Sequence, residues 1–254
     1  MGNGYYKGMN YKDTTYYEGK YYTFPIEILR CLMDEPKERL RDVLCHHSAL
    51  LEGDSQAEFM ELYKLSNKDL ERGIELLNCG SNSGVNFSIT ARMFDRYYCI
   101  PDSKQNKDWL LLLAYLSLKS LQGKYKVALC DSKRMFIRMA GYVGKSAFDE
   151  GGGLKAVGCI GEYMQNERKA REWSKKLRIA LMDAFNEFHT YSSPHKRGFA
   201  YMFSNQRRDR CLQQMAAFME QRTAKYKENL YKQMMRDAEK AIKSKPKPAN
   251  KDTS

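Results

Sequence analysis

Apolar residues recur at intervals of three and four along much of this chain, the spacing that places them on one face of an α-helix. The sequence predicts two helical segments that begin at Pro25 and Pro36, positions where proline is tolerated because they fall in the first turn of a helix. Two more are predicted over residues 55–65 and 66–78. Ser66 and Asp69, three positions apart, are spaced as a capping box for the last of these.

The most apolar segment of the chain covers residues 109–121. It is apolar on most sides of a helix, which predicts a central position in the core. Asp108 is the expected N-cap of this helix, and residues 99–108 are expected to form a loop before it.

Short elements with different periods follow this central helix. Residues 124–130 alternate between polar and apolar types and predict a strand, after which Asp131 or Ser132 caps a short helix. Six glycines fall within residues 144–161, which predicts a flexible insertion. A longer amphipathic helix is expected over residues 166–188.

Two short runs of β-type residues then flank a Ser-Ser-Pro-His-Lys-Arg-Gly bend and predict a β-hairpin. A hairpin alone is barely stable in water, so its apolar face must pack on another element. We expect the hairpin to pack against the helices over 109–121 and 177–185. Its aromatic contributors would be Tyr191, Phe199, Tyr201 and Phe203.

These elements predict a mainly α fold with a small β-hairpin. The expected parts are a Tyr-rich arm (1–22), a helical N-terminal region (23–100), a winged-helix-like domain with the 144–161 insertion (101–204), and a basic helix with a disordered tail (205–254). From residue 108 the order is helix, strand, helix, insertion, helix and hairpin. This is the order of a winged helix, a relative of the helix-turn-helix whose third helix enters the major groove beside the hairpin.

Charge is distributed unevenly along the chain. The formal net charge is +12, and residues 155–254 hold 22 basic and 11 acidic side chains. Such a field favours an anionic partner, either nucleic acid or an acidic membrane. The alternative is a basic surface that only keeps the protein soluble.

Four stretches carry a resemblance to a known family: "YYTFPIEILR" (21–30), "DWLLLLAYLSLKSLQGKYKVA" (108–128), "FIRMAGY" (136–142) and "RGFAYMF" (197–203). Together they resemble replication-initiator-like and regulatory winged-helix proteins of bacterial plasmids, phages and other mobile elements. The resemblance implies binding to double-stranded DNA at a repeated origin or operator, in DNA replication or transcription regulation. It also places Lys175 and Arg178 at the start of a recognition helix, and Lys196 and Arg197 at a wing tip.

Candidate DNA-binding residues follow from this interpretation. Ser174, Lys175 and Arg178 lie off the apolar stripe of their helix and are expected on an exposed basic face. The full set is Ser174, Lys175, Lys176, Arg178, His195, Lys196, Arg197, Arg207 and Arg208. In the alternative interpretation they are the solvated side of an amphipathic helix, ordinary turn residues, and cations paired along a helix.

Motifs for catalysis or for a cofactor are not found in the sequence. "GYVGKS" (141–146) lacks the glycine that a phosphate-binding loop needs at position 139, where Met139 stands. His46 and His47 are adjacent and point to different faces of a helix, and no zinc-ligand pair accompanies Cys45. We therefore expect a non-enzymatic protein without a metal or cofactor.

The cysteines and the apolar runs bear on the compartment. Seven cysteines without a Cys-x-x-Cys pair favour reduced thiols, the first residues lack the apolar region of a secretory signal, and the run at 109–118 is too short to cross a bilayer. The expected location is the cytoplasm of a bacterium or of a phage-infected cell, with no membrane partner.

A second function remains open at this point. The Met-rich helix after residue 205 could dock on a partner in a phage or mobile-element assembly, or form a homodimer, with Met215, Met219, Met234 and Met235 on its apolar face. These methionines could equally pack on the protein's own core. The Tyr-rich arm could stack on unpaired bases or dock on the protein's own surface.

Overall fold

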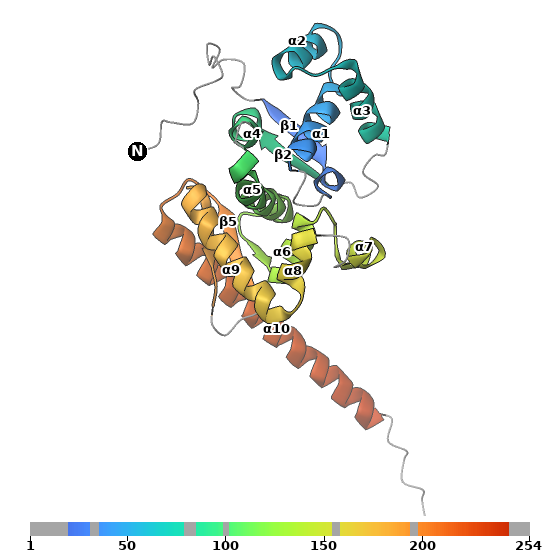
Figure 1. Cartoon of the computed structure of the whole chain (residues 1–254). Helices are drawn as coiled ribbons and strands as arrows, with labels where there is room; N and C mark the ends of the chain where they lie inside the picture. The colour runs from blue at the N-terminus through green and yellow to red at the C-terminus, as the bar shows by residue number, and fades with distance from the viewer. Residues whose placement is uncertain are drawn as a thin grey trace, which may run out of the picture.

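The computed structural model describes residues 20–30, 36–78, 85–98, 102–153, 158–193 and 198–243. Within these residues the chain is mainly helical, with two small antiparallel sheets and a long C-terminal helix (Figure 1). The helices are the 3-10 helix η2 (Ile26–Leu29), α1 (Pro36–Ser48), α2 (Gly53–Tyr63), α3 (Asn67–Asn78), α4 (Ala91–Tyr98), α5 (Asp102–Gln122), α6 (Ser132–Met139), α7 (Lys145–Glu150), α8 (Gly158–Met164), α9 (Glu167–Ala184) and α10 (Arg208–Lys243). The strands are β1 (Tyr21–Pro25), β2 (Asn86–Thr90), β3 (Ala128–Cys130), β4 (Phe188–Tyr191) and β5 (Phe199–Phe203).

A two-stranded antiparallel sheet of β1 and β2 lies largely within residues 23–100, which the sequence predicts to be a helical region. Tyr22 is buried in β1, as are Phe87 and Ile89 in β2, whereas Asn86 and Ser88, which alternate with Phe87 and Ile89 along β2, are exposed. This period of two is the signal of a half-buried strand. The helix expected to begin at Pro25 is only the single 3-10 turn of η2.

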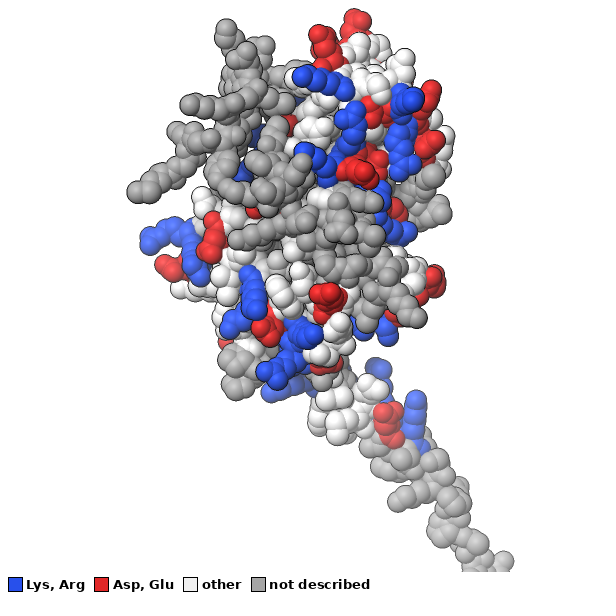
Figure 2. All heavy atoms as spheres, viewed as in Figure 1, with Lys and Arg blue, Asp and Glu red and all other residues white. Residues whose placement is uncertain are grey.

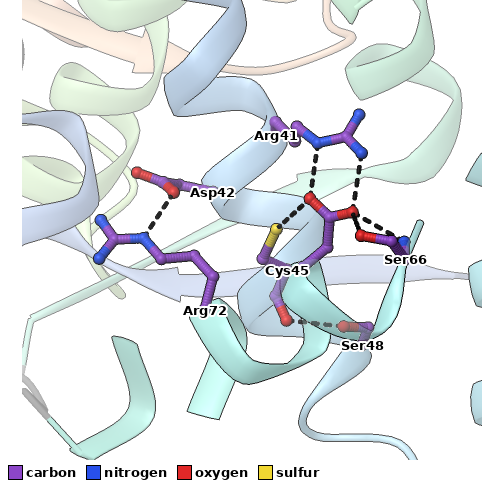
Figure 3. A network of polar contacts seen from close by, with 7 residues as sticks. Arg41, Asp42, Cys45, Ser48, Ser66 and Arg72 are labelled. Atoms are coloured by element: carbon purple, nitrogen blue, oxygen red, sulfur yellow. Dashed lines mark hydrogen bonds and ion pairs between the residues drawn. The ribbon is translucent and has the colours of Figure 1, made fainter. Parts of the chain in front are cut away.

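α1 and α3 are joined by two ion pairs (Figure 3). Arg41 on α1 donates two hydrogen bonds to the Asp69 carboxylate, at 2.7 and 2.8 Å, and Arg72 on α3 donates to Asp42 at 3.1 Å. Asp69 also accepts from the backbone N–H and the hydroxyl of Ser66, both at 2.7 Å. The predicted Ser66–Asp69 cap is present, and the Arg41 guanidinium holds the pKa of Asp69 well below its usual range.

α5 runs through the centre of the molecule (Figure 1). Trp109 is 2 % exposed, and Leu112, Ala114 and Leu118 are not exposed at all, so the predicted central position is confirmed. The loop expected over 99–108 is wrong from Asp102 onward, because the helix begins there and Asp108 lies inside it. Residues 102–108 contain neither Gly nor Pro, the residue types that commonly interrupt a helix, so the helix can extend through them.

The second sheet has the strand order β3-β5-β4, and all its pairs are antiparallel. The predicted strand before residue 131 and the predicted hairpin are both present. Phe199 and Tyr201 are buried on the face of this sheet towards α5, and the Tyr201 hydroxyl donates to the Leu118 carbonyl at 2.9 Å. The Phe203 ring lies 5.0 Å from the Tyr115 ring of α5. The expected packing of the hairpin on the central helix is therefore confirmed for Tyr201 and Phe203, and Phe199 is buried in the same core with its ring 4.1 Å from the Arg178 guanidinium of α9.

The other face of this sheet is covered by the first turns of α10. Ala200 and Met202 pack there with Cys211, Met215 and Met219. Tyr191 belongs to this second cluster, so its expected position against the central helix is wrong. Met215 and Met219 pack on the protein's own core.

The glycine-rich stretch 144–161 contains α7 and the start of α8. Phe148 and Ile160 are buried in the main core, 2 % and 3 % exposed. The expectation of an unstructured insertion is therefore wrong for the residues that the structure describes, because these two apolar side chains give each short helix a face to bury. Residues 154–157 lie outside them.

A single cluster of buried apolar side chains connects the two halves of the chain, from Tyr22 to Tyr201. Between the halves, Arg30 donates from Nε to the Gly141 carbonyl at 3.0 Å and lies over the Tyr142 ring at 4.4 Å. Gly141 has a φ of +81°, and a Cβ atom there would lie 2.6 Å from the Arg30 side chain. The expected domain boundary at 100/101 lies outside the described residues.

Candidate nucleic-acid interface

α9 carries the largest group of predicted site residues. The Asn166 side chain caps it by accepting from the Lys169 N–H at 2.9 Å. Ala170, Leu177 and Leu181 form its buried stripe. This confirms the amphipathic helix expected over 166–188, although it ends at Ala184.

Ser174 and Arg178 do not lie on the exposed face of α9. Ser174 is completely buried, with its hydroxyl 3.7 Å from the Met135 sulfur on α6, and Arg178 is 9 % exposed. The predicted position of these two residues on an exposed basic face is wrong. Positions 170, 174, 178 and 181 are spaced by four, four and three, so both polar side chains share the face of the apolar stripe.

Arg178 joins α9 to the end of β4 that leads into the turn of the β4–β5 hairpin. Its Nη1 donates to the hydroxyls of Thr190 at 3.1 Å and Ser192 at 2.8 Å, and its Nε donates to the Ser174 carbonyl at 3.3 Å. The guanidinium also lies 4.1 Å from the centroid of the Phe199 ring. Burial lowers the pKa of Arg178 to about 10, and within the described residues no carboxylate pairs with it.

The exposed side of α9 is rich in cations towards its N-terminus. Lys176 pairs with Glu172 at 3.0 Å, and Arg171 pairs with Glu167. Arg168 and Lys175 have no ion-pair partner among the described residues. The exposed cations of α9 are Arg168, Lys169, Arg171, Lys175 and Lys176, and Figure 2 shows blue side chains gathered over this part of the helix.

Two further cations come from the start of α6. Asp131 caps this helix by accepting from the Arg134 N–H at 2.8 Å, as the sequence predicts, and Lys133 and Arg134 are exposed. Gly198, with a φ of +81°, opens β5 against the end of β3: a Cβ atom there would lie 2.6 Å from the Cys130 carbonyl oxygen. The hairpin therefore returns beside the start of α6.

A buried arginine, Arg138, lies in the last turn of α6. Arg138 on α6 is 6 % exposed and donates from Nη2 to the Val143 carbonyl at 3.0 Å. Burial and the neighbouring Arg134 lower the pKa of Arg138. The charges of Arg134, Arg138 and Arg178 all act on the Cys130 thiol, whose pKa burial nevertheless raises to about 12. Cys130, at the end of β3, therefore lies within the electrostatic influence of three guanidinium groups.

The remaining predicted site residues divide into two groups. His195, Lys196 and Arg197 lie outside the described residues. Arg207 and Arg208 are exposed but follow the far end of β5, away from the hairpin turn. The structure therefore does not bring them beside Lys175 and Lys176.

Lys133, Arg134 and Arg168 were missed by sequence reasoning. A signal was available, since Lys133 and Arg134 directly follow a predicted N-cap and so fall in the exposed first turn of a helix. Arg168 occupies the equivalent position after Asn166.

Comparisons with models of protein families, with curated proteins and with solved structures find no match to this chain. Among the described residues, no group of three or more His, Cys, Asp or Glu side chains is placed to hold a metal ion. Over the same residues, every helix is too short or too polar to cross a membrane.

Proposed function

We propose that this protein binds double-stranded DNA through the winged-helix-like unit formed by α5, β3, α6, α9 and the β4–β5 hairpin. In this proposal α9 is the recognition helix, the hairpin is the wing, and the protein acts in replication initiation or transcription control of a plasmid, phage or other mobile element. The observation that carries the proposal is the exposed cationic face of α9 beside a hairpin that is bonded to the same helix at the turn end of β4.

Phosphate contacts supply most of the affinity of such proteins, and side chains on the recognition helix supply the base contacts. Arg168 and Lys175 are exposed and have no carboxylate partner among the described residues, so both can contact DNA without breaking an ion pair. Lys133 and Arg134 extend the cationic surface from α9 to the start of α6. In this proposal all four contact the duplex.

Arg178 has a positioning role in this proposal. Its guanidinium is bonded to the Ser174 carbonyl and to two hydroxyls at the turn end of β4, so it holds the wing at a fixed angle to α9. A preorganised wing lowers the entropy lost when the protein binds.

The test is fluorescence anisotropy with a labelled duplex of random sequence, titrated over a range of salt concentrations. The logarithm of the association constant should fall linearly with the logarithm of salt concentration. The variant R168A/K175A should bind more weakly, and its salt slope should be smaller by about 2, since each lost phosphate contact removes about one unit.

The matched control is K64A/K68A, which removes two exposed lysines around the α2–α3 turn at the other end of the molecule. We expect its affinity and salt slope to match those of the parent protein. Absence of duplex binding at low salt, or equal losses in the two double variants, would overturn the proposal.

A further inference from the structure

The second half of α10 projects away from the rest of the protein (Figure 1). The stripe of the helix that packs on the sheet, from Met215 to Met219, continues along the same face through Thr223, Tyr226, Leu230 and Met234, with steps of three and four. Beyond Thr223 the side chains of this stripe are exposed to solvent. The exposed fractions are 68 % for Tyr226, 44 % for Leu230 and 63 % for Met234.

Charge limits what can cover this stripe. Residues 222–240 contain six basic and three acidic side chains. Arg222 and Lys240 border the stripe on one side and Lys227 borders it on the other. Asp237 lies on the stripe beyond Met234, whereas Glu228 and Glu239 lie on the opposite face of the helix. Along the stripe and its borders these three cations outnumber the single acid, so two such stripes facing each other would repel on balance and a symmetric α10–α10 pair is disfavoured.

The opposite charge pattern is found at the other end of the molecule, on α2 and α3. Residues 52–78 contain seven acidic and three basic side chains. Exposed apolar side chains lie among these acids: Leu62, 37 % exposed, follows Glu58 and Glu61, and Ile74, 48 % exposed, lies between Glu71 and Glu75. Figure 2 shows red side chains, with some blue, at the top of the molecule over these helices.

We infer that the chain associates with itself head to tail, with the projecting half of α10 of one copy seated on the α2–α3 surface of the next. The two surfaces are complementary in charge, each exposes apolar side chains, and they lie at opposite ends of one chain (Figure 1). A contact between two different surfaces does not close after two copies, so it generates longer assemblies. High salt weakens it, because most of the charges involved are exposed.

Analytical ultracentrifugation of the full chain over a range of protein concentrations tests the inference. We expect the mean mass to rise with concentration at low salt, and to fall towards that of the monomer at high salt. The variant L230E/M234E, which changes the α10 surface (the tail), and the variant E58K/E61K, which changes the α2–α3 surface (the head), should each remain monomeric. All four side chains are exposed, so these changes do not remove a core contact.

A control and a mixing experiment make the test specific. A217E/Q221E adds two charges with the same spacing on the opposite, exposed side of α10 and should associate like the parent protein. Mixing the head and tail variants leaves one intact head and one intact tail, so the mixture should give a 1:1 dimer and nothing larger. A monomeric parent protein would overturn the inference, as would a head variant that associates normally or a mixture that stays monomeric.

Discussion

The crossing of α1 and α3 yields a stability prediction at Gly73. A Cβ atom at this position would lie 2.0 Å from the carbonyl oxygen and 2.7 Å from the carbonyl carbon of Cys45, both in the backbone of α1. Because these are backbone atoms, no side-chain rotation relieves the overlap. The two helices would have to separate by more than 1 Å to reach the 3.0 Å below which real Cβ contacts are essentially never found.

Two effects of opposite sign decide the outcome of Gly73→Ala. Alanine favours a helix over glycine by about 1 kcal/mol. Overpacking a close contact costs about 1–3 kcal/mol and more where the backbone cannot move. Here the Arg41–Asp69 and Arg72–Asp42 ion pairs resist separation of the helices. We therefore expect the overpacking cost to exceed that range, at about 3–4 kcal/mol, which leaves a net loss of about 2–3 kcal/mol.

Urea unfolding followed by circular dichroism measures this loss. The midpoint should fall while the slope with denaturant stays constant. Gly144→Ala is the control, because a Cβ atom at this position meets nothing within 4 Å. Gly144 is the N-cap of α7, where alanine is less favourable than glycine, and we expect the free energy of unfolding to fall by less than about 1 kcal/mol. A Gly73→Ala protein as stable as the parent would refute the close crossing.

Three further predictions concern buried polar groups. Tyr63→Phe removes the hydroxyl that donates to Asp95 at 2.8 Å, and should cost about 1–3 kcal/mol in urea unfolding, whereas Tyr125→Phe at an exposed site should be neutral. Burial lowers the pKa of His47 to about 4, so the folded state favours the neutral ring. The free energy of unfolding should therefore fall as pH drops from about 6.5 to about 4, by up to about 2 kcal/mol after allowance for partial exposure. His47→Phe should make the free energy of unfolding less dependent on pH in this range, and an unchanged pH dependence would contradict the reasoning. Arg178→Lys keeps the charge but loses the guanidinium, whose Nη1 donates to two hydroxyls and whose Nε donates to the Ser174 carbonyl. Amide exchange in β4 should therefore quicken while α5 stays protected, and uniform exchange would contradict the positioning role.

The elements that could be predicted from sequence are those with strong local signals. The central helix was predictable because its apolar run leaves no polar face, and the start of α6 because Asp131 is a good N-cap. The β1–β2 sheet was not predicted, since its strands are five residues long and more than sixty residues apart, so that only the finished fold pairs them. The helices α7 and α8 are stable through burial of Phe148 and Ile160, which outweighs the glycines around them.

The candidate site was only partly predictable because side-chain charge does not by itself determine burial. Lys175 is exposed as expected, yet Arg178, three positions further, is buried. A buried guanidinium is tolerated only where its donors and its aromatic face find partners. The Ser174 carbonyl is one turn earlier in α9, whereas two hydroxyls at the turn end of β4 and the Phe199 ring reach Arg178 only after the hairpin has folded back onto α9. The same contacts that remove Arg178 from the surface fix the hairpin relative to Lys175, and so the residue acts on the candidate interface by orienting it.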